Sequence, residues 1–127
     1  MERDWDIIRE ILIKLEKTNP DEKFVKLSDF PEEKHFIVSY NAKLLIDAGL
    51  VQGKIMPFRG VSPKPADLYL ENLTWNGHEF LDTIKNDTVW QKTKESFLSR
   101  GLDMSLDLVK SVAIDIAATI IKKAAGL

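Results

Sequence analysis

The chain has no cysteine among its 127 residues. This absence excludes a disulfide scaffold, a zinc–thiolate site and a cysteine nucleophile, and it fits a reducing cytoplasm. Only two histidines are present, so an imidazole metal site would have to bring His35 and His78 together. We therefore expect no bound metal and no cofactor.

The sequence also lacks the short motifs of common catalytic and nucleotide-binding sites. Gly49, Gly53 and Gly60 are neither followed by Gly-Lys-Ser/Thr nor spaced as G-x-G-x-x-G. No H-E-x-x-H and no G-x-S-x-G occurs. The acidic pair Glu32-Glu33 sits in a polar turn, where a solvated surface is the ordinary interpretation. We therefore expect a protein that is not an enzyme.

No segment has the features of a secretion signal or a membrane span. The first ten residues, MERDWDIIRE, are charged throughout and hold no apolar signal-peptide core. The apolar stretch over residues 105–125 is interrupted by Asp115, whereas a membrane span needs roughly 20 mostly uncharged apolar residues. Lys122 and Lys123 are compatible with binding at a membrane surface, but the acids oppose it. We expect a cytoplasmic protein with no membrane partner.

A folded core is well supplied, because 44% of the residues are hydrophobic and 30% are charged, a balance typical of globular domains. Apolar residues over residues 4–16 follow helical spacing, and Asn19-Pro20 ends that helix. A short strand is predicted for residues 23–27. Asp29 is placed to cap the short helix that follows.

Residues 36–48 form the clearest predicted helix. It ends at Gly49, because glycine readily adopts the left-handed conformation found after helices. A strand over 51–55, a Pro/Gly-rich loop over 56–67 and a return strand over 68–73 follow. The helix is predicted to bury one apolar face made of Phe36, Ile37, Tyr40, Leu44, Leu45 and Ala48.

Three further helices are predicted after the return strand. Thr74 is expected to cap the first with its hydroxyl, and Gly77 to allow close approach of another backbone segment. Thr88 and Gln91 form a capping box for the second helix, and Ser105 caps the third. The first of these helices is predicted to bury Trp75, Phe80, Leu81 and Ile84.

The order of these elements is that of a winged helix-turn-helix domain. Residues 36–48 would be the recognition helix and residues 56–67 the wing. The predicted fold class is α+β and mostly helical, with a small antiparallel wing sheet and a C-terminal helical extension. We expect the winged-helix domain to span residues 1–86 and the helical extension to span residues 87–127.

Three segments carry a resemblance to a known family: RDWDIIREIL near the start, LLIDAGLV at residues 44–51, and above all LTWNGHEFLDTIKNDTVW at residues 73–90. The chain resembles, over nearly its whole length, an uncharacterised family of small prophage-associated winged-helix proteins, catalogued as a domain of unknown function. The resemblance implies a bacterial or phage origin and a winged-helix fold. It implies no catalytic residue and no ligand. Residues 32–41 depart from the family pattern.

Local charge favours a nucleic-acid partner, although the net charge of the chain is −2. Between residues 34 and 64 the only acid is Asp47, among several lysines and an arginine. Phosphate contacts dominate affinity for DNA and require such a cationic patch, and polar ends on the recognition helix suit base edges. The candidate contacts to double-stranded DNA are Lys34, His35, Ser39, Asn41, Lys43, Lys54, Arg59 and Lys64.

Two other interpretations of this surface stay open. The cations could simply keep a surface soluble, and many winged helices bind proteins rather than DNA. The leading hypothesis is a non-catalytic DNA-binding regulator of a prophage or mobile element. The alternative is a phage-encoded adaptor or inhibitor that binds a host or defence protein through the same surface.

The last predicted helix, over residues 105–125, has its polar residues on one narrow stripe and is largely apolar elsewhere. A single globular body cannot cover several sides of one helix, and an exposed apolar patch marks an interaction site. We therefore expect a homodimer whose interface contains Ile114, Ile116, Ala117, Ile120, Ile121 and Ala124.

Overall fold

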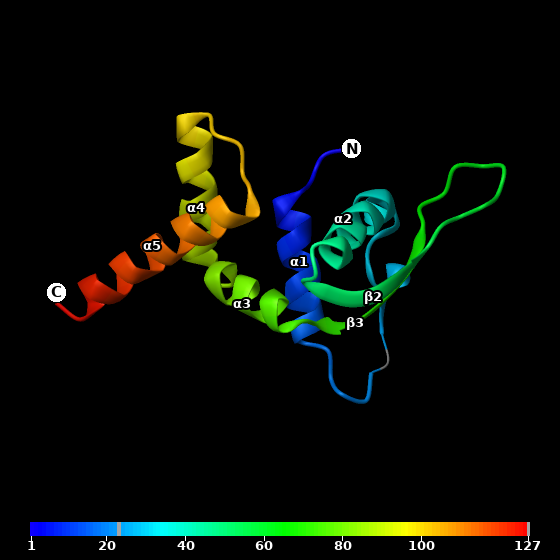
Figure 1. Ribbon diagram of the computed structural model, residues 1–127, viewed down its shortest axis with the longest axis horizontal. Coiled ribbons are helices and arrows are strands. Elements are labelled where there is room, and N and C mark those ends of the chain that lie inside the picture. Colours follow the sequence, from blue (N-terminus) through cyan, green and yellow to red (C-terminus); the bar gives the residue numbers. More distant parts are fainter. Residues whose placement is uncertain (23, 127) are drawn as a thin grey trace. The chain divides into compact units, whose positions relative to one another are not determined.

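The computed structural model describes residues 1–22 and 24–126 (Figure 1). Lys23, the first residue of the predicted strand 23–27, lies outside the described residues. The chain divides into two compact units, Met1–Glu79 and Phe80–Leu127. The division falls inside one helix, α3, which spans Trp75–Ile84.

The first unit is α+β, as predicted. Its sheet is antiparallel with the strand order β1-β3-β2, so the last strand in the sequence is the central one. The elements before α3 are α1 (Trp5–Glu16), β1 (Val25–Lys26), the 3₁₀ turns η1 (Leu27–Asp29) and η2 (Glu32–Lys34), α2 (His35–Asp47), β2 (Val51–Met56) and β3 (Asp67–Leu73).

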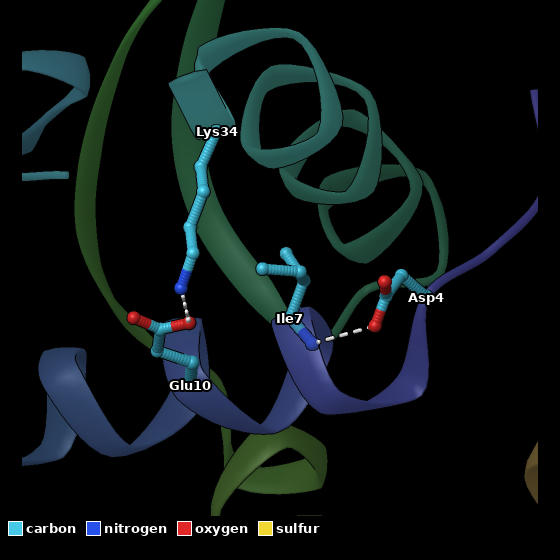
Figure 2. Close-up of polar contacts among 4 residues, drawn as sticks. All are labelled: Asp4, Ile7, Glu10 and Lys34. Atoms are coloured by element: carbon cyan, nitrogen blue, oxygen red, sulfur yellow. Dashed lines mark hydrogen bonds and ion pairs between the residues drawn. The ribbon is translucent and has the colours of Figure 1, made fainter. Parts of the chain in front are cut away.

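Helix α1 begins where the Asp4 carboxylate accepts a hydrogen bond from the Ile7 backbone N–H at 3.0 Å (Figure 2). An aspartate at this position satisfies one of the amide groups that has no partner inside the helix. The helix buries its apolar side against the rest of the first unit. The buried residues are Ile7, Ile8, Ile11, Leu12 and Leu15.

Strands β2 and β3 form an antiparallel hairpin around the loop at residues 57–66, which confirms the predicted strand, loop and return strand. The register pairs Val51 with Leu73 at one end and Met56 with Asp67 at the loop end. Strand β1 pairs with the other edge of β3, where Val25 lies opposite Leu70. The loop projects beyond the sheet from the ends of the two long strands (Figure 1).

The short helix predicted before α2 is present only as the 3₁₀ turns η1 and η2. The Asp29 carboxylate, predicted to cap that helix, does not cap η2. It accepts a hydrogen bond from the Lys26 backbone N–H at 2.8 Å and so holds η1 together. The other end of α2 follows the prediction, since Gly49 has a φ of 75° in the left-handed region that suits glycine.

The predicted buried face of α2 is wrong in part. Leu45 is buried as predicted, but Phe36 is 51% exposed. The other buried residues lie on a neighbouring face and are Val38, Ser39, Asn41 and Ala42. Apolar residues occur on nearly every side of this helix, so spacing alone cannot decide which side is inside. Two polar residues enter the core because their hydrogen bonds are satisfied there.

The start of α3 is fixed by two residues that the sequence placed correctly. The Thr74 hydroxyl accepts a hydrogen bond from the Gly77 N–H at 3.0 Å and donates one to the Gly49 carbonyl at 2.6 Å. A Cβ on Gly77 would overlap the Leu50 carbonyl oxygen, so this glycine permits the close backbone approach that was predicted. Trp75, predicted to be buried, is 78% exposed.

The second unit contains the rest of α3, then α4 (Asp87–Arg100) and α5 (Leu106–Ala124). The predicted capping box is wrong, because the Asn86 side chain caps α4 by accepting from the Val89 N–H at 3.0 Å. Ser105 caps α5 as predicted, with its hydroxyl 3.3 Å from the Leu108 N–H. The buried apolar residues of this unit are Phe80, Leu81, Ile84, Val89, Trp90, Phe97, Val109 and Ala113.

Candidate nucleic-acid interface

The candidate interface lies wholly in the first unit and consists of α2 and the β2–β3 hairpin. The hairpin loop at residues 57–66, called here the wing, is exposed from residue 57 to residue 64. The C-terminal end of α2 leads directly into β2 through Gly49 and Leu50. Strand β2 therefore connects the end of α2 to the start of the wing.

The wing and its base are cationic. Lys54, Arg59 and Lys64 are exposed, and the sequence holds no acid between Asp47 and Asp67. A surface of this kind attracts phosphate groups, because no neighbouring carboxylate on the same segment offsets the positive charge. This is the strongest electrostatic feature of the predicted contact set.

Two of the predicted cations already have acidic partners. The Lys43 ammonium lies 3.7 Å from the Asp47 carboxylate on the same helix, and the Lys34 ammonium lies 3.8 Å from the Glu10 carboxylate of α1 (Figure 2). Solvent-exposed pairs like these are worth at most about 1 kcal/mol. A phosphate could displace either carboxylate at small cost.

Three predicted contacts are placed differently by the structure. Asn41 is 0% exposed, so the expectation that it meets base edges is wrong. Its Oδ1 accepts from the Asp4 N–H at 2.9 Å and its Nδ2 donates to the Ile37 carbonyl at 2.8 Å. His35 is half-buried, with Nε2 donating to the Phe30 carbonyl at 2.9 Å. Both side chains hold α2 against its neighbours.

Ser39 is the third residue that is placed differently, because it is buried against the base of the wing. Its hydroxyl donates to the Ala66 carbonyl oxygen at 2.7 Å. This bond joins the middle of α2 to the residue just before β3. Ser39 therefore positions the wing relative to the helix, a role that its polarity alone did not reveal.

The solvent side of α2 holds Phe36 and Tyr40, which the sequence assigned to the core, beside the candidate contact Lys43. Phe36 and Lys43 are exposed and Tyr40 is half-buried, and the three recur at spacings of four and three along one side of the helix. The sequence alone does not show which side of α2 faces solvent, because apolar residues lie on both sides of the helix. Any partner of α2 meets these side chains first.

An open groove of about 610 Å³ lies between the start of α2 and the wing. The Phe58 ring leans over Gly60, where an added Cβ would overlap it. The Lys64 ammonium lies 5.2 Å from the centre of the same ring. The groove thus combines aromatic surface with charges of both signs, since Glu32 and Asp67 line it as well as Lys64. It is lined by Leu27, Ser28, Glu32, His35, Phe36, Phe58, Pro63, Lys64, Pro65 and Asp67.

The predicted dimer residues on α5 separate into two sides. Ile116 and Ile120 turn toward α4 and line a hollow of about 250 Å³ together with Lys92. Ile114, Ile121 and Ala124 are exposed, and Ala117 is half-buried. This second group forms a strip along one side of α5, while Ile120 on the first side is 36% exposed.

Among residues 1–22 and 24–126, no three histidine, aspartate or glutamate side chains are grouped so that they could hold a metal ion. His78 is exposed, near the start of α3. Over the same residues, no helix has both the length and the apolar run that crossing a bilayer requires.

The chain is similar to proteins of one family. A family model described as "Hypothetical protein (DUF2513)" matches residues 2–103. The chain belongs to this family. A Haemophilus influenzae protein of strain Rd, titled "Uncharacterized protein", is 42% identical over 113 residues, which are 89% of this chain and 92% of the relative. No solved structure matches the chain.

The DUF2513 match covers the candidate interface completely, together with α3 and α4. It ends at residue 103, before the start of α5 at Leu106. The candidate interface therefore lies inside the region that the family model matches, and the exposed strip of α5 lies outside it.

Proposed function

We propose that this DUF2513 protein is a non-catalytic DNA-binding regulator of the winged-helix type that acts in a prophage or mobile element. The order α1, β1, α2, β2, wing, β3 and the antiparallel sheet support the winged-helix assignment. One observation carries the function: an exposed wing with Lys54, Arg59 and Lys64 and no acid between Asp47 and Asp67.

In this proposal α2 enters the major groove and the wing follows the phosphate backbone. The wing cations supply the sequence-independent part of the affinity, because each neutralised phosphate releases condensed counterions. On α2, Lys43 exchanges its Asp47 partner for a phosphate. Phe36 and Tyr40 offer apolar contact of the kind that thymine methyl groups accept.

Charge reversal on the wing tests the proposal. Lys54→Glu with Arg59→Glu should weaken duplex binding by more than about tenfold at low salt, since two attractions become repulsions. For the unaltered protein, log affinity should fall linearly with log salt, by about 0.9 for each neutralised phosphate. Gel shifts with a pool of random duplexes, including the gene's own promoter, measure both quantities.

The matched control is Lys92→Glu, a charge reversal at an exposed site of the second unit, which should leave the affinity unchanged. If the wing variant binds as tightly as the wild type, or if the wild type does not bind duplexes at low salt, the DNA proposal is wrong.

The alternative partner is a host or defence protein that contacts the same surface. It is favoured by the exposed apolar side chains Phe36, Phe58 and Val61, because such patches mark protein contacts as well. Phe36→Ala with Phe58→Ala would then abolish capture of that partner, and a competing duplex would not release it.

The proposal also includes pairing of two chains through α5. Two copies of the helix and wing, related by a two-fold axis, would match a two-fold DNA site. Each copy would then contribute one cationic wing to the complex.

A further inference from the structure

Helix α5 exposes a regular apolar strip that α4 leaves uncovered. The helix packs on α4 and buries Val109 and Ala113 completely. By contrast, Ile114 is 50% exposed and Ile121 is 68% exposed. Each residue turns a helix by about 100°, so this strip lies about a quarter turn away from the side that is packed.

The strip follows the spacing of a helix-pairing surface. Residues 114, 117, 121 and 124 are separated by three, four and three positions, which is the a/d pattern of a heptad repeat. Large and small side chains alternate along it. We call these four residues, Ile114, Ala117, Ile121 and Ala124, the α5 seam.

We propose that the α5 seam packs antiparallel against the α5 seam of a second copy of this chain. The inference rests on the pairing included in the proposed function and adds its surface and orientation. Alanines permit close approach of two helix axes, to about 8 Å. An isoleucine of one copy then fills the space above an alanine of the other, so a single surface is complementary to itself.

The charges at the two ends of α5 select the antiparallel orientation. Asp103 and Asp107 lie at its N-terminal end, where Lys110 offsets one of them, while Lys122 and Lys123 lie in its last turn. A parallel pair would bring like charges together at both ends. An antiparallel pair places the acidic end beside the basic end and also opposes the two helix dipoles.

The polar side of α5 argues for a protein occupant over a membrane surface. Asp107 and Asp115 are exposed there, whereas helices that lie in a bilayer interface carry lysine and arginine on that side. Two of the three basic residues of α5, Lys122 and Lys123, instead lie in its last turn, which suits pairing with the acidic end of an identical helix.

The absence of cysteine allows a direct test of the orientation. In an antiparallel pair, residues near the middle of the seam lie close to their own counterparts, while residues at its end are about 15 Å or more apart along the axis. Ala117→Cys should therefore be joined to dimers by a short bis-maleimide cross-linker. Ala124→Cys should not, and neither should Thr119→Cys on the opposite side of the helix.

The oligomeric state without DNA gives the second arm. The wild type should scatter light as a dimer, and Ile114→Asp with Ile121→Asp should give a monomer with unchanged circular dichroism. If the first variant does not fold, the milder double substitution Ile114→Ser with Ile121→Ser is measured in its place. Leu98→Asp, at an exposed apolar site on α4, should remain dimeric.

A monomeric wild type at all concentrations, or a dimer that survives the seam substitutions, overturns the proposal. Efficient cross-linking at both Ala117→Cys and Ala124→Cys overturns the antiparallel orientation. Because these measurements contain no DNA, their failure leaves duplex binding by α2 and the wing to be judged separately.

Discussion

A fully buried asparagine joins the start of α1 to the middle of α2. Asn41 accepts from the Asp4 N–H and donates to the Ile37 carbonyl, while Asp4 itself caps α1 through Ile7. The cap and the asparagine thus form one short chain of hydrogen bonds. Because such bonds are buried, removing one partner costs more than an exposed bond would.

Replacing this asparagine should reduce stability without altering DNA contacts. Asn41→Ala leaves the Asp4 amide without its acceptor and should lower the free energy of unfolding by about 1–3 kcal/mol. Urea unfolding measures the loss, and Asn72→Ala, at an exposed position of β3, should change little. If the Asn41→Ala variant is as stable as the wild type but binds duplexes more weakly, the prediction is wrong and Asn41 belongs to the DNA interface.

Helices and strands were predictable where one residue type is demanded by local geometry. Gly49 at a left-handed φ, Ser105 at a helix start and Gly77 under a carbonyl oxygen are such positions, because few other residues meet the steric or hydrogen-bonding need. The sheet followed from alternating apolar residues and the proline-rich loop between them. These features define the helix and the hairpin on which the candidate interface lies.

The orientation of α2 and the cap of α4 were not predictable in this way. In α2, apolar residues surround the helix, so the buried side depends on which neighbours α1 and the wing supply. Ser39 and Asn41 looked like surface residues because their acceptors and donors, on Ala66 and Asp4, are distant in the sequence. Tertiary packing decides which side of α2 is buried, and local pattern carries no information about it. The cap of α4 is local, but Asn86 and Thr88 can both cap a helix, so the pattern does not choose between them.

The start of α4 offers two residues that can cap, and the choice between them is testable. Asn86→Ala should lower the free energy of unfolding by about 1 kcal/mol, because its side chain holds the Val89 amide. Thr88→Ala should lower the free energy of unfolding by only a few tenths of that amount, since Thr88 lies inside the first turn of α4. Denaturant midpoints of the two variants give the comparison, and a larger loss for Thr88→Ala would contradict this cap.

For the whole molecule, the surface proposed to meet DNA and the surface proposed to pair chains belong to different units. The candidate interface lies within Met1–Glu79 and the α5 seam within Phe80–Leu127. Substitutions in one unit should therefore separate affinity for a single site from the gain that comes with two sites. This separation makes the two proposals independently measurable.

The expected outcome concerns duplexes carrying one or two copies of a selected site. Ile114→Asp with Ile121→Asp should bind a one-site duplex like the wild type but lose at least about tenfold in affinity for the two-site duplex, because avidity requires both chains. Titrations with labelled duplexes measure the difference. Equal losses on both duplexes would show that the seam substitutions disturb the first unit.

Thr74 donates hydrogen bonds to the carbonyls of residues 49 and 50. These bonds hold the two ends of the β2–β3 hairpin together, so the wing is a loop between fixed ends. The free-energy cost of closing a loop, which is entropic, rises by only about 0.6 kcal/mol for each doubling of the loop length. The wing can therefore accept inserted residues between Gly60 and Val61 with little loss of fold. Members of the family could in this way exchange their targets by changing one exposed loop, while the domain that carries it stays the same.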